Sequence, residues 1–326
     1  MTVVAPRAMD PTLDEVSIEL TPVHTPADRR FFGLLACSAA IMFMLLVSIM
    51  VFLAYHGWWA LSHFKLKFFL GTTWSAPAHP GVLALIGGSV AIALVALVFA
   101  LPISIATALM INEFAPARLR KWLTTLIDLL ATVPSIVYGF WGLEALSPWL
   151  NGTSEWIVKH LGFIPIFRTN YAGSYEHSIF ICGIVVSIMI TPVITSITRE
   201  VMAQAPREAC EAALALGGTR WGMITDVVLP FSRSGMVGAT LLGLSRAMGE
   251  TIAILLILSS NSTALTGHIM GPEGSTVAKQ IGTDFTISST QGQSELVLAG
   301  LTLFATTLIF SLGGRIIVQR GTGPRR

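Results

Sequence analysis

Charged residues are scarce in this sequence. Asp, Glu, Lys and Arg make up 12% of the 326 residues, whereas hydrophobic residues make up 53%. A soluble globular chain carries about 25% charged residues, so this composition indicates a protein that is solvated by a lipid bilayer. Cysteine is equally rare, and Cys37, Cys182 and Cys210 suggest no disulfide framework. The net charge of +2 is too small to indicate a nucleic-acid partner.

Motifs for catalysis and for nucleotide binding are also missing. None of the seven histidines belongs to a His-Glu-x-x-His pattern, and no nucleophile–base or metal set is visible. There is no Gly-rich loop ending in Gly-Lys-Ser or Gly-Lys-Thr, so the chain has no such device for binding ATP. We therefore expect no catalytic residues, no metal and no cofactor on this chain, and any ATP energy must come from another polypeptide.

Long apolar runs dominate the sequence instead. A helix needs about 20 mostly apolar residues to cross the ~30 Å hydrocarbon core of a bilayer. Six runs meet this requirement, which predicts an all-α membrane protein with six transmembrane helices: Gly33–Ala54, Val82–Ile111, Trp122–Leu146, Ser178–Thr198, Ser234–Leu258 and Leu296–Val318. The second run contains Pro102, so we expect it to be kinked or tilted.

The distribution of Lys and Arg predicts the orientation of these spans, because cytoplasmic loops are enriched in both. With both termini in the cytoplasm, fourteen of the twenty cations are cytoplasmic and five lie in the external loops. The external five are Lys65, Lys67, Lys159, Arg168 and Lys279, and the remaining cation, Arg246, lies inside a span. The sequence therefore predicts a multi-pass inner-membrane protein with cytoplasmic termini.

The chain is expected to form one membrane domain and a tail. Residues 1–30 are polar and proline-containing and are interpreted as a flexible cytoplasmic tail, and residues 31–326 as the six-helix domain. The external loops 55–81, 147–177 and 259–295 are large. Within the last of these, residues 275–281 are expected to form a short surface helix.

The cytoplasmic loop 199–233 carries the most informative pattern. Pro206 is suited to begin a helix, and the pair Gly217-Gly218 is suited to break it. A second amphipathic stretch, Thr219–Leu229, follows and is expected to end at Pro230. This pattern predicts a helix–turn–helix between two spans, although an amphipathic loop that rests on the membrane surface fits the composition equally well.

The spacing of this loop resembles the signature of bacterial ABC importer permeases. That signature is Glu-Ala-Ala, three residues, Gly, nine residues, an aliphatic residue, one residue and Leu-Pro, and Val227 stands where isoleucine is usual. The resemblance implies the type I ABC importer permease fold with a cytoplasmic coupling helix-turn-helix. It also implies an ATPase-coupling site at Glu211, Ala212, Ala213, Gly217, Leu229 and Pro230.

Other segments resemble the phosphate-specific (Pst) permeases. They are residues 112–116, 133–139, 191–201 and 246–251, and residues 68–74 resemble PstC-type subunits more than their PstA-type partners. The likeness covers about residues 60–318 and leaves the role of the tail open. It implies a PstA-like second permease, a PstB-like cytoplasmic ATPase dimer that holds ATP and Mg²⁺, a PstS-like extracytoplasmic binding protein, and inorganic phosphate as substrate.

Ionisable residues inside spans are functional candidates because their burial is costly. Arg246 lies twelve residues beyond Ser234, or about 18 Å into the fifth span, and Glu250 follows at i+4 on the same predicted face. Asp128 lies about 9 Å into the third span. Candidate pathway residues are therefore Arg246, Glu250, Asp128, Pro134, Ser135 and Tyr138.

Four of these residues also have a structural interpretation. Arg246 and Glu250 would then form an ion pair that joins two spans. Asp128 would bond a neighbouring helix, and Pro134 would only kink its helix. For the whole chain, the nearest alternative is a permease for molybdate or sulfate. A gradient-driven secondary transporter is more distant, because it has no use for the Glu211–Pro230 loop.

Overall fold

The computed structural model describes residues 26–75, 79–169, 171, 173–258, 267–272 and 274–321. Residues 1–25 of the expected tail and residues 259–266 of the last external loop lie outside the described residues. The structure divides into two compact units, Met1–Val51 and Phe52–Arg326. Helix α1 (Pro26–Phe64) begins inside the stretch that we expected to be a flexible tail.

Five helical stretches of the described chain are long and apolar enough to cross a membrane. They are centred on α1, α3 (Val82–Leu109), α7 (Ile179–Ala203), α10 (Leu229–Met248) and α13 (Thr290–Gly321). A sixth span is present if the bent pair Ala117–Thr132 and Ser135–Leu161 is one crossing. The remaining elements are α2 (Leu66–Leu70), β1 (Trp74–Ser75), β2 (His79–Pro80), η1 (Met110–Phe114), α4 (Ala117–Thr132), α5 (Ser135–Trp141), η2 (Gly142–Leu146), α6 (Ser147–Leu161), α8 (Arg207–Ala215), α9 (Arg220–Met223), η3 (Ile224–Val228), α11 (Ile252–Ile257) and α12 (Val277–Asp284).

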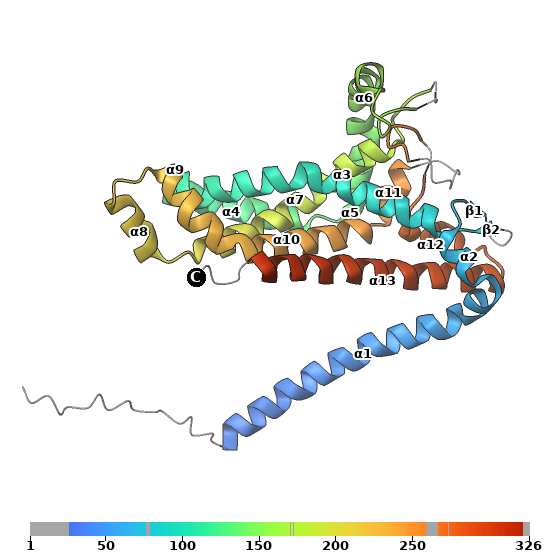
Figure 1. Ribbon diagram of the computed structural model, residues 1–326, viewed down its shortest axis with the longest axis horizontal. Coiled ribbons are helices and arrows are strands. Elements are labelled where there is room, and N and C mark those ends of the chain that lie inside the picture. Colours follow the sequence, from blue (N-terminus) through green and yellow to red (C-terminus); the bar gives the residue numbers. More distant parts are fainter. Residues whose placement is uncertain are drawn as a thin grey trace, which may run out of the picture. The chain divides into compact units, whose positions relative to one another are not determined.

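The core of the second unit surrounds α7. This helix packs against α3, α10 and α4, and α13 lies beside α10 (Figure 1). Ser178 caps its start, because its side chain accepts a hydrogen bond from the Ile181 N–H. Almost three quarters of the most apolar stretch of α7 is buried within the protein (72%), whereas α13 buries far less. Helix α7 is therefore the central helix of this unit's core.

Three π-helical turns each precede a proline at the same spacing in the sequence. The turns η1, η2 and η3 each end two residues before a proline, namely Pro116, Pro148 and Pro230. Proline has no N–H with which to bond the carbonyl four residues earlier. The π-helical turn uses i→i+5 bonds instead, such as the bond from the Leu229 N–H to the Ile224 carbonyl.

This accommodation corrects the prediction that the second cytoplasmic helix ends at Pro230. The helical path continues from Arg220 through η3 into α10, and Pro230 occupies the first turn of α10. Because the π-helical bonds of η3 replace the regular bonds ahead of Pro230, its missing N–H does not interrupt the helical path. The coupling segment is thus joined to the membrane helix without a flexible loop.

The third predicted span is not a continuous helix. Its axis bends by 89° between residues 117–132 and 135–161. The residue before a proline is pushed out of the helical region, and Val133 has an extended backbone (φ −62°, ψ 131°) ahead of Pro134. The apolar run across 122–146 indicated a span with a proline in it, and the structure shows that the helix is sharply broken there rather than gently kinked.

The fifth predicted span, Ser234–Leu258, is also broken. Helix α10 ends at Met248, and Gly249 takes a bridging conformation (φ −90°, ψ 0°) before the short helix α11 begins at Ile252. Glu250 therefore does not follow Arg246 on one helical face, as the sequence predicted. The break lies between the two residues that were expected to act together.

The short helix near residues 275–281 is present, but it is not on the surface. Helix α12 packs against α3, α11 and α13, and Thr276, Val277 and Lys279 are buried. The backbone of Ser275 approaches Gly88 so closely that an added Cβ would lie 2.1 Å from its carbonyl oxygen. Lys279, predicted to be an external-loop cation, is thus an interior residue with only 7% exposure.

Glu295 is a fully buried carboxylate in the second turn of α13. Neither of its oxygens has a hydrogen-bond partner among the described residues. Its neighbour Ser294, in contrast, is fully engaged with α1, donating to the His56 carbonyl at 2.7 Å and accepting from the Ala60 N–H at 3.3 Å. A buried polar group without a partner destabilises the folded state.

Replacing Glu295 with methionine is therefore expected to raise the free energy of unfolding by about 1–3 kcal/mol, because the desolvation cost disappears. An increase in the midpoint of thermal unfolding of the detergent-solubilised protein measures this gain. Glu144→Met is the matched control, since Glu144 is exposed and its loss should change stability by no more than about 0.5 kcal/mol. A less stable Glu295→Met protein would contradict the expectation.

Candidate functional site: a broken span and a coupling turn

Arg246 lies in the last turn of α10 and is exposed on the surface of this chain. It makes no hydrogen bond or ion pair with any described residue. Its charge acts on Tyr138 of α5, which places the two side chains in the same region. An exposed guanidinium that no carboxylate neutralises is available to an anion.

Glu250, unlike Arg246, is buried, and its contacts are structural. Its Oε1 accepts a hydrogen bond from the Ala253 N–H at 3.1 Å, so the carboxylate holds the start of α11. A negative charge is favourable at a helix N-terminus. The described residues contain no Arg246–Glu250 ion pair, because the helix ends between them and the carboxylate points toward α11.

Pro134, Ser135 and Tyr138 lie at the start of α5, on the other side of the third-span break. Pro134 is exposed, whereas Ser135 and Tyr138 are half-buried. The Tyr138 hydroxyl donates to the Leu130 carbonyl at 2.9 Å and so bridges α5 and α4. Helix α5 lies against α11 at Gly139, where an added Cβ would come within 2.7 Å of the Ala253 Cα. The two broken spans therefore meet at their breaks.

Asp128 lies apart from this meeting point in its contacts. Its Oδ1 accepts a hydrogen bond from Ser196 Oγ at 2.7 Å, which ties α4 to α7. The carboxylate is otherwise exposed. The contact that the structure shows for Asp128 therefore joins two helices. Arg246 and Tyr138 lie in one region, and no described hydrogen bond joins Asp128 to either of them.

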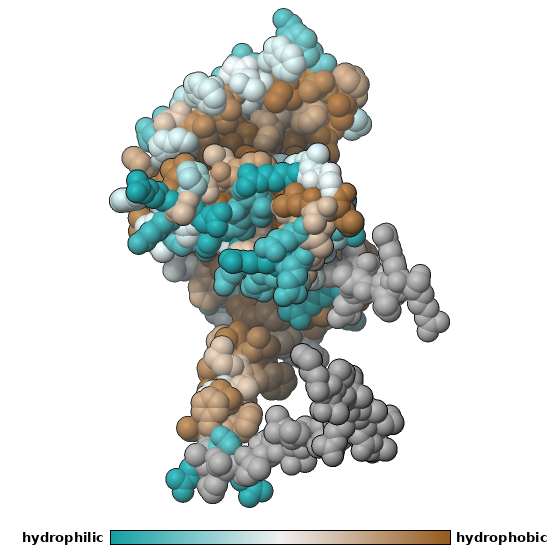
Figure 2. Space-filling model, turned by 90° about the vertical axis from the view of Figure 1, so that its left-hand side faces the viewer, coloured by the Kyte–Doolittle hydropathy of each residue, from teal (hydrophilic) through white to brown (hydrophobic). Residues whose placement is uncertain are grey.

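The coupling segment forms the helix–turn–helix that the sequence predicted. Helix α8 follows Pro206 and has no buried residue, so Glu211 and Ala212 face outward and Ala213 is half-buried. Figure 1 places α8 and α9 at one end of the second unit, and Figure 2, which views that end, shows hydrophilic residues gathered over it. Leu214, Leu216 and Trp221 add exposed apolar side chains there.

Gly217 turns the chain between α8 and α9. Its φ of +85° lies in the left-handed region, which favours glycine. The Gly217 and Gly218 N–H groups donate to the Leu214 and Ala213 carbonyls and so satisfy the end of α8. An added Cβ would meet no atom within 4 Å, so backbone conformation rather than crowding within this chain requires glycine here.

The second half of the coupling segment is anchored in the unit. Met223, Ile224 and Val228 are buried with Ala108 of α3 and Met202 of α7. Leu229 packs against this cluster, and Pro230 is exposed at the start of α10. The helices α9, η3 and α10 form one helical path, so the segment after the Gly217 turn is continuous with the helix that carries Arg246.

Cys210 occupies the inner side of α8. Partial burial is the main cause that raises the pKa of its thiol, and the nearby carboxylates of Glu113 and Glu211 raise it further. The thiol is therefore predominantly protonated at neutral pH and packs as a small apolar side chain against the buried cluster.

Two buried ionisable residues escaped prediction from the sequence. Glu295 stands one residue before the run that we assigned to the sixth span, and Lys279 stands in a loop. The charges of Lys279 and Glu250 both act on the buried Cys182 of α7, so α12 brings a cation near the fifth-span break. In the sequence, the burial of Lys279 was signalled only weakly. The small residues Ala278 and Gly282 beside it permit a helix in this loop to pack closely against its neighbours.

Comparisons with known proteins agree with this architecture. Residues 100–320 match the family described as "Binding-protein-dependent transport system inner membrane component". The chain is 35% identical over 297 residues to "Phosphate transport system permease protein PstC" of Xylella fastidiosa, which covers 90% of this chain and 91% of the relative. It is 39% identical over 224 residues to "Phosphate transport system permease protein PstC 2" of Mycobacterium bovis, which covers 68% of this chain and 69% of that relative.

A solved structure shares the fold at low sequence identity. It is titled "Crystal structure of bacterial alginate ABC transporter in complex with alginate pentasaccharide-bound periplasmic protein". The match has a TM-score of 0.61 at 17% identity and covers 91% of this chain and 96% of that chain. The predicted all-α fold of the type I ABC importer permease kind is confirmed. The chain belongs to the family of binding-protein-dependent transport system inner membrane components.

Proposed function

We propose that this chain is the transmembrane permease subunit of an ATP-driven phosphate importer and forms half of its translocation pathway. The observation that carries the proposal is the similarity, over 90% of the chain, to a relative named as a phosphate permease. Labelled-phosphate uptake by the assembled importer tests it. Selective uptake of molybdate or sulfate instead would replace phosphate with another oxyanion.

Arg246 is proposed to lower the barrier to the anion. Phosphate carries one to two negative charges and enters a low-dielectric region only with compensation. Arginine stays charged and offers forked donors that match phosphate oxygens. The exposure of Arg246 and its freedom from any described partner support this role. Tyr138, Ser135 and Pro134 are proposed to line the same passage from α5.

Glu250 is proposed to shape the passage by holding the start of α11. Its hydrogen bond to Ala253 places α11 against α5 at Gly139. Asp128 is proposed to keep α4 against α7 through Ser196. These carboxylates would act through other groups, so neither needs to contact the anion.

Helix α8 is proposed to dock on a separate ATPase, on which ATP and Mg²⁺ are held. Glu211 offers a charge to a basic partner, and Gly217 sets the angle at which α8 is presented. The exposure of the whole helix supports this role. The ATPase is proposed to be a PstB-like dimer, and the second half of the pathway a PstA-like permease.

The phosphate is proposed to arrive on a PstS-like binding protein at the opposite end of the unit. Loops 55–81 and 259–295 are the proposed contacts. Phe285 and Ile287 are exposed in the described part of the second loop. The α12 segment of the same loop is buried, so it would support the contact surface rather than form it.

Both termini and loop 199–233 are proposed to be cytoplasmic, on the basis of the cation bias. Single cysteines placed at Thr219 and Ser289, both exposed, report this orientation in a chain whose native cysteines are replaced by serine. A membrane-impermeant maleimide added to intact cells should modify the cysteine at 289 and spare the one at 219. The opposite labelling pattern would reverse the orientation.

A further inference from the structure

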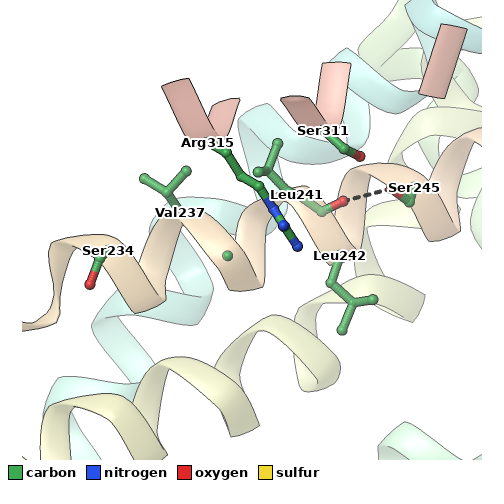
Figure 3. Close-up of a pocket in the computed structure, with 8 residues that line it drawn as sticks. Ser234, Val237, Leu241, Leu242, Ser245, Ser311 and Arg315 are labelled. Carbon is green, nitrogen blue, oxygen red and sulfur yellow. Dashed lines mark hydrogen bonds between the residues drawn. The ribbon is translucent and has the colours of Figure 1, made fainter. Parts of the chain in front are cut away.

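A cavity of about 450 Å³ lies between α10 and α13, and a single arginine enters it. Figure 3 shows the Arg315 side chain extending from α13 toward Leu241 and Leu242 of α10. The two helices approach closely at Gly314, where an added Cβ would come within 2.6 Å of Leu241 Cδ2. This contact fixes the base of the arginine, so its guanidinium points into the cavity.

All but one of the polar side chains that line the cavity lack a described hydrogen-bond partner. Ser311 precedes Arg315 by four residues and therefore lies on the same face of α13. Arg315, Ser311 and Ser234 make no hydrogen bond or ion pair with any described residue. Only the Ser245 hydroxyl is engaged, donating to the Leu241 carbonyl at 2.9 Å. No carboxylate lines the cavity, so its charge is positive.

The lining of the cavity along α10 ends one residue before Arg246. Ser234, Gly238, Leu242 and Arg246 follow one another at intervals of four along α10, and all four are exposed. The first three line the cavity, and Ser245, at its far end, is the residue before Arg246. From Ser234 to Ser245 the cavity follows α10 for eleven helical steps of 1.5 Å, or about 16 Å. One exposed face of α10 thus runs from the cavity that holds Arg315 to Arg246.

The size of the cavity suits a hydrated oxyanion. A water molecule occupies about 30 Å³ of liquid, so 450 Å³ accommodates a phosphate group with several waters. Two separate cationic stations also suit conduction, because a single strong site would trap the ion. The end of the cavity at Ser234 lies near η3, the segment that joins α10 to the coupling helices.

We infer that this cavity is a second station for a phosphate group, in which Arg315 and Ser311 receive the anion after Arg246. The inference rests on the proposed function, and it adds a binding site beyond the fifth-span break. The same donors suit two sources of a phosphate group, namely free inorganic phosphate and a phospholipid headgroup. Measurements of transport and of bound lipid separate the two.

The test uses the complete importer in proteoliposomes with ATP, its binding protein and radiolabelled phosphate. Arg315→Gln is expected to lower the maximal uptake rate about tenfold or more while the half-saturating phosphate concentration and the basal ATPase rate stay unchanged. Arg315→Lys should retain most of the uptake, because it keeps the charge. Arg233→Gln is the matched control: Arg233 is also an exposed α10 arginine, but it lies outside the cavity.

Mass spectrometry of phospholipid retained by the purified complex supplies the second arm. Loss of one retained phospholipid in Arg315→Gln with normal uptake assigns the phosphate group to a lipid. Normal uptake and normal lipid content in Arg315→Gln overturn the inference, while a competent wild type leaves the proposed function intact. A wild-type importer that takes up no phosphate overturns the proposed function, and the free-phosphate station falls with it.

Discussion

Replacing Arg246 with glutamine is expected to lower phosphate uptake about 10- to 150-fold. A hydrogen bond to a charged group contributes about 1.5–3 kcal/mol, and each 1.36 kcal/mol of barrier is a factor of ten in rate. The arginine is exposed and unpaired among the described residues, so its removal should leave folding intact. Uptake by the importer, normalised to the amount of assembled complex, measures the effect.

Three further variants separate the pathway role from a structural role. Arg246→Lys should retain part of the uptake, because the charge remains but the forked geometry is lost. Glu250→Gln should impair uptake less than Arg246→Gln, since the glutamine side-chain oxygen still accepts from the Ala253 N–H. If an Arg246–Glu250 pair only joined helices, the double change to leucine would restore both stability and uptake. That result would remove Arg246 from the pathway.

Replacing Gly217 with valine is expected to abolish coupling, with uptake reduced at least tenfold and the protein still inserted in the membrane. A left-handed conformation costs an L-residue about 1–2 kcal/mol, and a β-branched side chain tolerates it least. The turn would then reorganise and move α8. Co-purification of the ATPase and ATP-driven uptake are the two measurements.

Gly217→Asn is the informative control, because asparagine adopts the left-handed region more readily than other residues with a side chain. Apart from its chain neighbours, no described residue has an atom within 4 Å of a Cβ added at Gly217. If the left-handed backbone alone requires glycine at position 217, asparagine should be tolerated there and valine should not. Equal loss in both variants would show instead that the ATPase surface excludes any side chain at this position. Glu211→Lys should also disrupt ATPase association, by reversing the charge offered to a basic partner.

Local signals explain why the coupling turn was predictable from the sequence. Pro206, Gly217 and Gly218 act on the backbone of their immediate neighbours, and their effects do not depend on distant contacts. The start of α7 was equally predictable, because Ser178 precedes an apolar run and caps the helix. The first and last spans were placed correctly in the chain, although α1 and α13 extend beyond the apolar runs.

The breaks and the buried charges depend on tertiary contacts. Apolar residues continue through Pro134 and through Gly249, so hydropathy alone sees one span in each case. The Ala253 N–H that engages Glu250 becomes available only because α10 ends at Met248. Lys279 was assigned to water because it lies in a loop, yet the packing of α12 against three helices buries it. Residue order could not reveal these contacts.

We expect this chain to import phosphate only as part of an ATP-driven assembly. The most direct measurement is radiolabelled phosphate uptake into proteoliposomes that contain this chain with its second permease, ATPase and binding protein, compared with proteoliposomes that contain this chain alone. We expect uptake by the full assembly that requires ATP and the binding protein, and none by the single chain. Phosphate uptake by the chain alone, without ATP, would instead identify a secondary transporter.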